Sequence, residues 1–283
     1  MNGRTKLSAI FFTALCLLTL HTSSASAFAL AGDYTGPLEF KFSDFSMGTL
    51  YQSSSGGYGN ADNVENGWGI FKINLIKTPA AQTLWFDGKD GEELTGIFYG
   101  IDDDLWEVSG SGLNIQSVGG IIDVYLDSSP DFDPTGGPAA RTTASTYPTV
   151  TDGELFLRLA MTPGIKFGNA DTTDDHIEYN NDLNATTSPF TGNGAFYANV
   201  VGGTYADIFD TNIHCILDDN GVEHCNDFFG IFDTTSPGEY QWLVSSEDPI
   251  SGASQAPVPE PATLAIFGTG LAGMIGLRKR KNS

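Results

Sequence analysis

Hydrophobic and polar residues alternate along most of this chain with the period of two that is typical of half-buried β-strands. The segment Leu38–Phe42 places three apolar side chains on one face and two charged ones on the other, and Phe71–Leu75 repeats the pattern. Short apolar segments between turn-forming residues predict further strands: Thr83–Phe86, Leu94–Tyr99, Leu113–Val118, Ile121–Leu126, Glu154–Ala160, Ala195–Val201 and Tyr240–Val244.

Strand segments of this length and spacing indicate an all-β fold. The chain has 34 glycines and 13 prolines, which suits many turns, and no long helical pattern occurs before residue 262. We therefore predict an antiparallel β-sandwich or jelly-roll-like body over residues 28–250. A signal peptide and a short C-terminal transmembrane helix are expected to flank it.

The first 27 residues have the three parts of a secretory signal peptide. Arg4 and Lys6 form a positive start, and an apolar segment follows over Leu7–Leu20. Ala25 and Ala27 form the small-residue box that a signal peptidase recognises. We therefore expect export through the secretory translocon and cleavage after residue 27, with an uncleaved anchor helix as the alternative.

The last part of the chain, residues 258–283, begins with Pro259, Glu260 and Pro261, after a segment at 251–257 that we predict to be a linker. An apolar stretch follows over 262–277. As a helix it spans about 24 Å, less than the roughly 30 Å hydrocarbon core of a membrane. The basic cluster that ends the chain is expected to stay in the cytoplasm by the positive-inside rule: Arg278, Lys279, Arg280 and Lys281.

This order of Pro-Glu-Pro, short apolar helix and terminal basic cluster resembles the PEP-CTERM sorting domain of Gram-negative bacteria. The resemblance is confined to Pro259–Pro261, the helix 262–277 and the basic cluster 278–281. It implies transient residence in the inner membrane and processing near Pro-Glu-Pro by a membrane-embedded exosortase. It also implies a final place at the cell surface or in the matrix of a bacterium that makes exopolysaccharide and biofilm. A simply membrane-anchored periplasmic domain is the alternative.

Charge excludes one class of function. Between residues 28 and 257 the chain has 7 basic and 34 acidic residues, a net charge of −27. A nucleic-acid-binding protein needs a cationic face that releases phosphate counterions, and this body lacks the residues to form one. We therefore expect no nucleic acid among its partners.

Two cysteines remain once the signal peptide is removed, Cys215 and Cys225. Asn220–Gly221 lies midway between them and predicts a tight hairpin turn of type I′, which would bring the cysteines opposite each other. An even number of cysteines in an exported chain favours a disulfide. The alternative is a metal site that also uses His214 and His224, but neighbouring residues of a strand point to opposite faces.

Closely spaced carboxylates suggest a cation site. Asp127, Asp131 and Asp133 lie in a segment rich in Gly and Pro, and oxygen ligands of this kind are those that Ca²⁺ prefers. The spacing does not match an EF-hand loop, so the default interpretation is solvated acidic loops, with a Ca²⁺ site as the alternative. Further acidic segments are Asp102–Asp104, Asp171–Asp175 and Asp87–Glu93. The sequence thus predicts no cofactor, with Ca²⁺ as the one alternative.

Two functional hypotheses from different classes remain. The first is a non-enzymatic surface or biofilm-matrix protein that associates with exopolysaccharide or cations, with Trp68 as a candidate exposed ring for sugar stacking. The second is an exported carbohydrate-active enzyme, for which a pair of carboxylates suffices. No catalytic motif singles out such a pair, so we predict no catalytic residue.

Overall fold

The computed structural model describes residues 30, 34–48, 65, 67–109, 112–166, 169–170, 177–179, 190–218, 220–236 and 238–255. Within these residues the protein is nearly all β, and the strand pairs of its sheets are antiparallel. The all-β antiparallel prediction is therefore confirmed. The signal peptide, the Pro-Glu-Pro segment, the helix predicted at 262–277 and the basic cluster lie outside the described residues.

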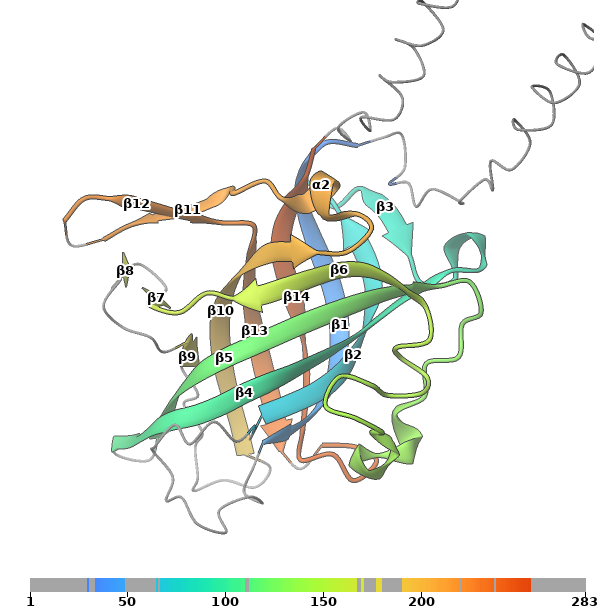
Figure 1. Cartoon of the computed structure of the whole chain (residues 1–283), viewed down its shortest axis with the longest axis horizontal. Coiled ribbons are helices and arrows are strands. Elements are labelled where there is room, and N and C mark those ends of the chain that lie inside the picture. The colour runs from blue at the N-terminus through green and yellow to red at the C-terminus, as the bar shows by residue number, and fades with distance from the viewer. Residues whose placement is uncertain are drawn as a thin grey trace, which may run out of the picture.

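One large sheet dominates the structure (Figure 1). Its strands are β1 (Gly36–Gly48), β2 (Gly67–Lys77), β3 (Thr83–Phe86), β4 (Glu93–Ser109), β5 (Gly112–Asp127), β6 (Glu154–Met161), β9 (Ile177–Tyr179), β10 (Phe190–Gly202), β13 (Phe228–Ser236) and β14 (Val244–Ser254). The remaining elements are β7 (Ile165–Lys166), β8 (Asn169–Ala170), β11 (His214–Leu217), β12 (Glu223–Asn226), the helix α2 (Ala206–Phe209) and the single-turn helices η1 (Lys89–Gly91), η2 (Pro134–Gly136) and η3 (Pro138–Ala140).

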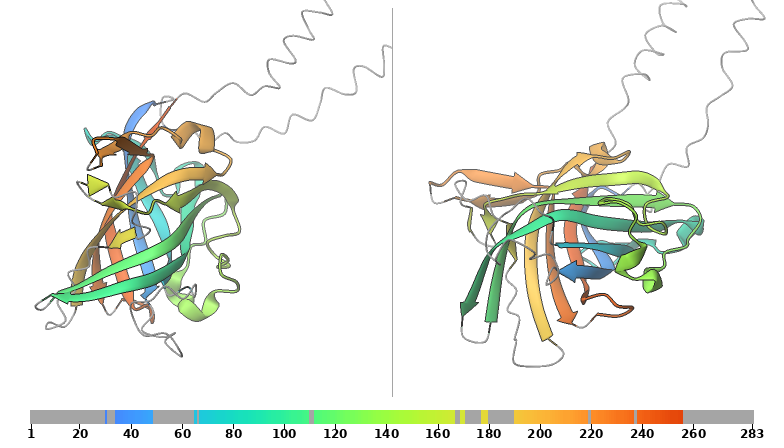
Figure 2. Two further views of the ribbon diagram at one scale, coloured as in Figure 1. Left: turned by 60° about the vertical axis from the view of Figure 1, so that its left-hand side comes forward. Right: turned by 60° about the horizontal axis from the view of Figure 1, so that its bottom comes forward.

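The large sheet closes on itself. Its strand order is β1-β14-β13-β10-β6-β5-β4-β2, and β2 pairs back to β1, so that eight strands enclose a common interior (Figure 2). The strands β3 and β9 extend the sheet by pairing with β2 and β5. A sandwich has two stacked sheets, whereas here the β1–β2 pairing joins what would be its free edges into one closed sheet.

Phenylalanines packed over glycines fill the interior. Phe71 lies opposite Gly96 in the register of β2 and β4, and Phe98 lies opposite Gly69 two positions away. A Cβ atom on Gly96 would come within 2.1 Å of the Phe71 ring. The strands β10 and β13 repeat the exchange in the pairs Phe196–Gly230 and Gly194–Phe232. A glycine opposite an aromatic residue lets the ring lie flat against the neighbouring backbone, which accounts for the many glycines within these strands.

The helix α2 closes one end of the sheet. Its Phe209 is fully buried and contacts the rings of Phe40, Phe156 and Phe228, which come from three different strands. The end of β14 lies beside it, because Gln255 donates its backbone N–H to a carbonyl of α2. This end of the body therefore carries its last described residue.

Loops bury a second apolar cluster on the outer face of the sheet. Ile70 and Ile97, which point outward from β2 and β4, are fully buried beneath Tyr147, Val150 and Trp242. The Trp242 indole N–H donates to a carbonyl at the start of η2, at 2.9 Å. The loop 128–153 is thereby held against the sheet, and its acidic residues take fixed positions.

Three local features of the strands differ from the sequence prediction. Residues 251–254 are the end of β14, paired with β1, and not part of a linker. The strand predicted over Tyr240–Val244 is mostly a turn, because Tyr240 and Gln241 have positive φ and β14 begins only at Val244. Finally, a register shift between β1 and β2 buries Ile76 completely and leaves Leu75 half-buried.

Candidate functional site

Three acidic residues come together where the β4–β5 hairpin meets the loop 128–153. Glu93 and Asp127 lie directly opposite each other at the open end of this hairpin. Asp131 follows in the loop, and the three side chains offer carboxylate oxygens within 4.8 Å of one another. The structure therefore joins two of the predicted ligands, Asp127 and Asp131, with a third residue that the sequence did not connect to them.

Glu93 is the buried member of this group. Its exposed fraction is 1%, and its Oε1 accepts the backbone N–H groups of Asp131, at 2.7 Å, and Phe132, at 3.0 Å. Its Oε2 is buried without a hydrogen bond, and the Lys72 ammonium lies 3.6 Å away from it. Glu93 thus fixes the start of the acidic loop through one oxygen and leaves the other available.

Lys72 is the cation beside this cluster, and it is shared. Its ammonium lies 2.6 Å from Asp87 Oδ2 and farther from Glu93 Oε2, and it also sits 5.9 Å from the centre of the Phe132 ring. A salt bridge of this kind holds Lys72 mainly at Asp87. The acidic group therefore keeps an excess of negative charge.

The pKa values reflect burial and crowding of like charges. Burial raises the pKa of Glu93, while hydrogen bonds from Asp131 and Phe132 and the charge of Lys72 oppose the rise. Desolvation raises the pKa of Asp131 as well, with further increases from the charges of Asp152, Asp127 and Asp133. A cation bound among these carboxylates would stabilise their ionised forms.

Asp133 takes a different place from the other predicted ligands. Its Oδ1 accepts hydrogen bonds from the backbone N–H and the hydroxyl of Thr135, at 2.8 Å and 2.6 Å, and so caps η2. These bonds lower the pKa of Asp133. The carboxylate thus has a local structural role, and the close group of oxygens contains Glu93 in its stead.

The hairpin β11–β12 carries the predicted disulfide. Cys215 and Cys225 lie directly opposite each other with their Cα atoms 4.0 Å apart, and their sulfurs are bonded. The hairpin stands away from the large sheet (Figure 1). Its turn is longer than the predicted two-residue type I′ turn, because the Asp218 N–H donates to the carbonyl of Val222 and three residues lie between them. The Asp218 carboxylate accepts the N–H groups of Asn220 and Val222.

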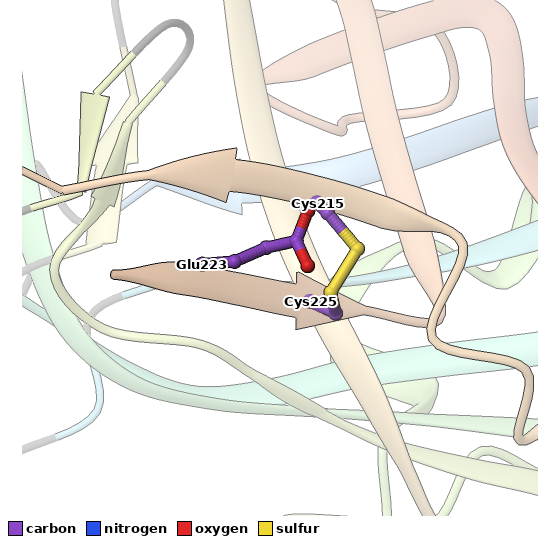
Figure 3. Close-up of side chains that lie close together, drawn as sticks. All are labelled: Cys215, Glu223 and Cys225. Carbon is purple, nitrogen blue, oxygen red and sulfur yellow. A yellow bond between two sulfur atoms is a disulfide. The ribbon is translucent and has the colours of Figure 1, made fainter. Parts of the chain in front are cut away.

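The alternative His/Cys metal site is not assembled in this hairpin. His214 Nε2 lies 3.0 Å from the carbonyl of Ser251, whereas His224 Nε2 lies 3.3 Å from the Asp218 carboxylate. Glu223 points toward the disulfide from the same strand as Cys225 (Figure 3). Because both sulfurs are bonded to each other, they are not thiolate ligands, and this group is no metal centre.

Asp227 anchors the base of the hairpin, and the sequence did not indicate this role. It is 2% exposed, and its carboxylate accepts three backbone N–H groups: Val200 at 2.8 Å, and Thr211 and Asn212 at 2.7 Å each. One side chain thus ties β10, the loop after α2 and the start of β13 together.

The aromatic rings proposed for sugar stacking are largely covered. Trp68 is half-buried, with the guanidinium of Arg141 4.1 Å above its ring and Trp242 packed edge-on at 5.3 Å. Glu65 holds that guanidinium through two hydrogen bonds. Trp68 is therefore part of the outer apolar cluster and not an exposed platform, which corrects the sequence interpretation.

The comparisons identify the tail. Residues 257–281 match the PEP-CTERM protein-sorting motif, as the resemblance indicated. The motif marks the chain as an exported protein that is anchored in the membrane and processed by an exosortase. It covers the tail alone, so it does not classify the body. Among the residues that the structure describes, no helix has the length and apolar character needed to cross a membrane.

The comparisons leave the body unclassified. No curated protein matches the sequence. One solved structure, that of a nonspecific heme-binding cyclase of neoabyssomicin biosynthesis, aligns over 97% of this chain and 94% of its own, at 10% sequence identity and a TM-score of 0.26. A likeness this low supports no conclusion about fold or function.

Proposed function

We propose that this protein is a non-enzymatic component of the cell surface or biofilm matrix, and that its acidic body associates with exopolysaccharide and Ca²⁺. The PEP-CTERM motif at residues 257–281 carries the proposal, because it supplies the route to the surface. The charge of the body supports it, because a net charge of −27 favours association through bridging cations.

The intact mass of the protein from its native host tests the sorting step. We expect the surface and medium fractions to contain a chain that starts at Phe28, lacks the segment after Pro-Glu-Pro and has lost two hydrogens to the disulfide. Replacement of Pro259, Glu260 and Pro261 by alanine should leave the full tail in the inner membrane. Ala256→Ser, one residue before the matched motif, serves as the control and should be processed normally.

An intact tail in the inner membrane of the wild-type cell would contradict this proposal. The protein would then be a simply anchored periplasmic domain. Release of reducing ends from host polysaccharide by the purified protein would also contradict it, in favour of a carbohydrate-active enzyme.

Co-sedimentation with the host exopolysaccharide tests the proposed partner. Because the body and an acidic polymer are both negative, we expect binding to need divalent cations and to fall when a chelator is added. Binding that is the same with and without chelator would rule out cation bridging.

A further inference from the structure

We propose that Glu93, Asp127 and Asp131 form a Ca²⁺ site at the open end of the β4–β5 hairpin. The assignment rests on the cation-dependent role proposed above and gives that role a location. The carboxylate oxygens of the three residues lie within 4.8 Å of one another. Two oxygens that bind one Ca²⁺ at 2.3–2.6 Å lie at most about 5 Å apart, so the existing spacing accommodates the ion.

Glu93 brings to this group a buried oxygen that lacks a hydrogen bond. Glu93 is 1% exposed, and its Oε2 receives no hydrogen bond although its Oε1 receives two. A buried ionised oxygen without a donor is unfavourable, and a bound cation removes that cost. Asp87 Oδ1, on the other side of Lys72, is also buried without a hydrogen bond.

Lys72 does not balance this charge. Its ammonium lies 2.6 Å from Asp87 and only within 3.6 Å of Glu93 Oε2, beyond hydrogen-bond distance. The groups that face the site are thus one ammonium and the carboxylates of Asp87, Glu93, Asp127, Asp131 and Asp152. A divalent cation leaves the group closer to neutrality.

The ligand chemistry favours Ca²⁺ over other metals. The three side chains offer oxygen ligands, which hard cations prefer, and no sulfur or imidazole of the kind that Zn²⁺ selects. Asp131 sits in a loop and Glu93 in a strand, so the ligands are adjustable on one side and fixed on the other. Water would supply the remaining positions of a Ca²⁺ ion. Sites with few charged ligands in extracellular modules bind Ca²⁺ at roughly 0.1–1 mM.

Titration of the full chain with CaCl₂ tests the assignment. The protein is extracted in a mild detergent, freed of metal with chelator, and followed by calorimetry and by its Tm. We expect one saturable site and a Tm that is higher by roughly 3–6 °C in 10 mM CaCl₂. Asp131→Asn and Glu93→Gln should each lower the affinity at least tenfold, and Glu93→Gln keeps an oxygen for the N–H groups of Asp131 and Phe132.

Asp133→Asn is the matched control. It removes one nearby charge and keeps an oxygen that caps η2, so we expect its affinity to remain within about twofold of wild type. Absence of saturable Ca²⁺ binding overturns the proposal. An affinity of Asp131→Asn equal to that of wild type also overturns it and would indicate diffuse counterion binding. A loss of affinity in Asp133→Asn as large as that in Asp131→Asn overturns it as well. If Glu93→Gln fails to fold, Asp131→Asn decides. None of these results depends on where the tail is processed, so failure of the site and failure of the sorting proposal are separate outcomes.

Discussion

Replacing Asp227 should destabilise the body more than any exposed acidic residue does. The Asp227 carboxylate is buried and accepts three backbone N–H groups at 2.7–2.8 Å. Asp227→Ala leaves these donors inside the protein without partners, and each orphaned buried donor costs about 1–3 kcal/mol. We therefore expect a loss of about 3–6 kcal/mol in the free energy of unfolding. Because domains are stable by only about 5–15 kcal/mol, this is a large fraction of the total.

Urea denaturation of the purified protein measures this loss. At an m-value of about 3 kcal/mol/M, the midpoint should fall by roughly 1–2 M in Asp227→Ala. Asp210→Ala is the matched control, since Asp210 is an exposed acid in the same loop and its side chain accepts the exposed side-chain amide of Asn212, at 3.2 Å. Its midpoint should stay within about 0.3 M of wild type. A midpoint for Asp227→Ala equal to that of the control would refute the anchoring role.

Three further changes test the structure elsewhere. Asp44→Asn should stabilise the protein by about 2–4 kcal/mol at pH 8 and hardly at pH 4. Burial raises the pKa of Asp44 to about 7, so between pH 4 and pH 7 the folded state keeps a proton that the unfolded chain loses. Urea midpoints of wild type and variant that differ equally at both pH values would contradict this. Replacing Cys215 and Cys225 by serine should cost about 2–3 kcal/mol, since their bond closes a short loop, and dithiothreitol should lower the Tm of the wild type but not of the variant. Gly96→Ala should cost about 1–3 kcal/mol through a clash with Phe71, and Phe71→Leu should recover part of the loss in a double-mutant cycle.

Local patterns predicted the strands well where one face of a strand is buried. Leu38, Phe40 and Phe42 are all buried in the interior, as their alternation with charged residues indicates, and β3 occupies the predicted range Thr83–Phe86. The closure of the sheet has no such local signal. It depends on the pairing of β1 with both β2 and β14, and β14 lies about two hundred residues away from β1 in the sequence.

The candidate cation site also depends on a strand pairing that local sequence patterns do not predict. Asp127 and Asp131 are close in sequence and were found together, whereas Glu93 lies on the preceding strand. Its position follows from the hairpin register that places Glu93 opposite Asp127. The prediction of two separate strands, Leu113–Val118 and Ile121–Leu126, hid this register, because the structure has one long strand β5 through Gly119 and Gly120.

Because Ser254 pairs with Gly36, the folded body extends to within a few residues of the Pro-Glu-Pro segment. Only four residues lie between Ser254 and Pro259, a reach of roughly 17 Å when fully extended. A folded domain of this size has a radius of gyration of about 17 Å. Cleavage at Pro-Glu-Pro, as proposed above, would require the exosortase to act within about this distance of α2 and the ends of β1 and β14. A partner bound over this end would shield the scissile segment, so the extent of processing reports whether that end of the body is free at the membrane.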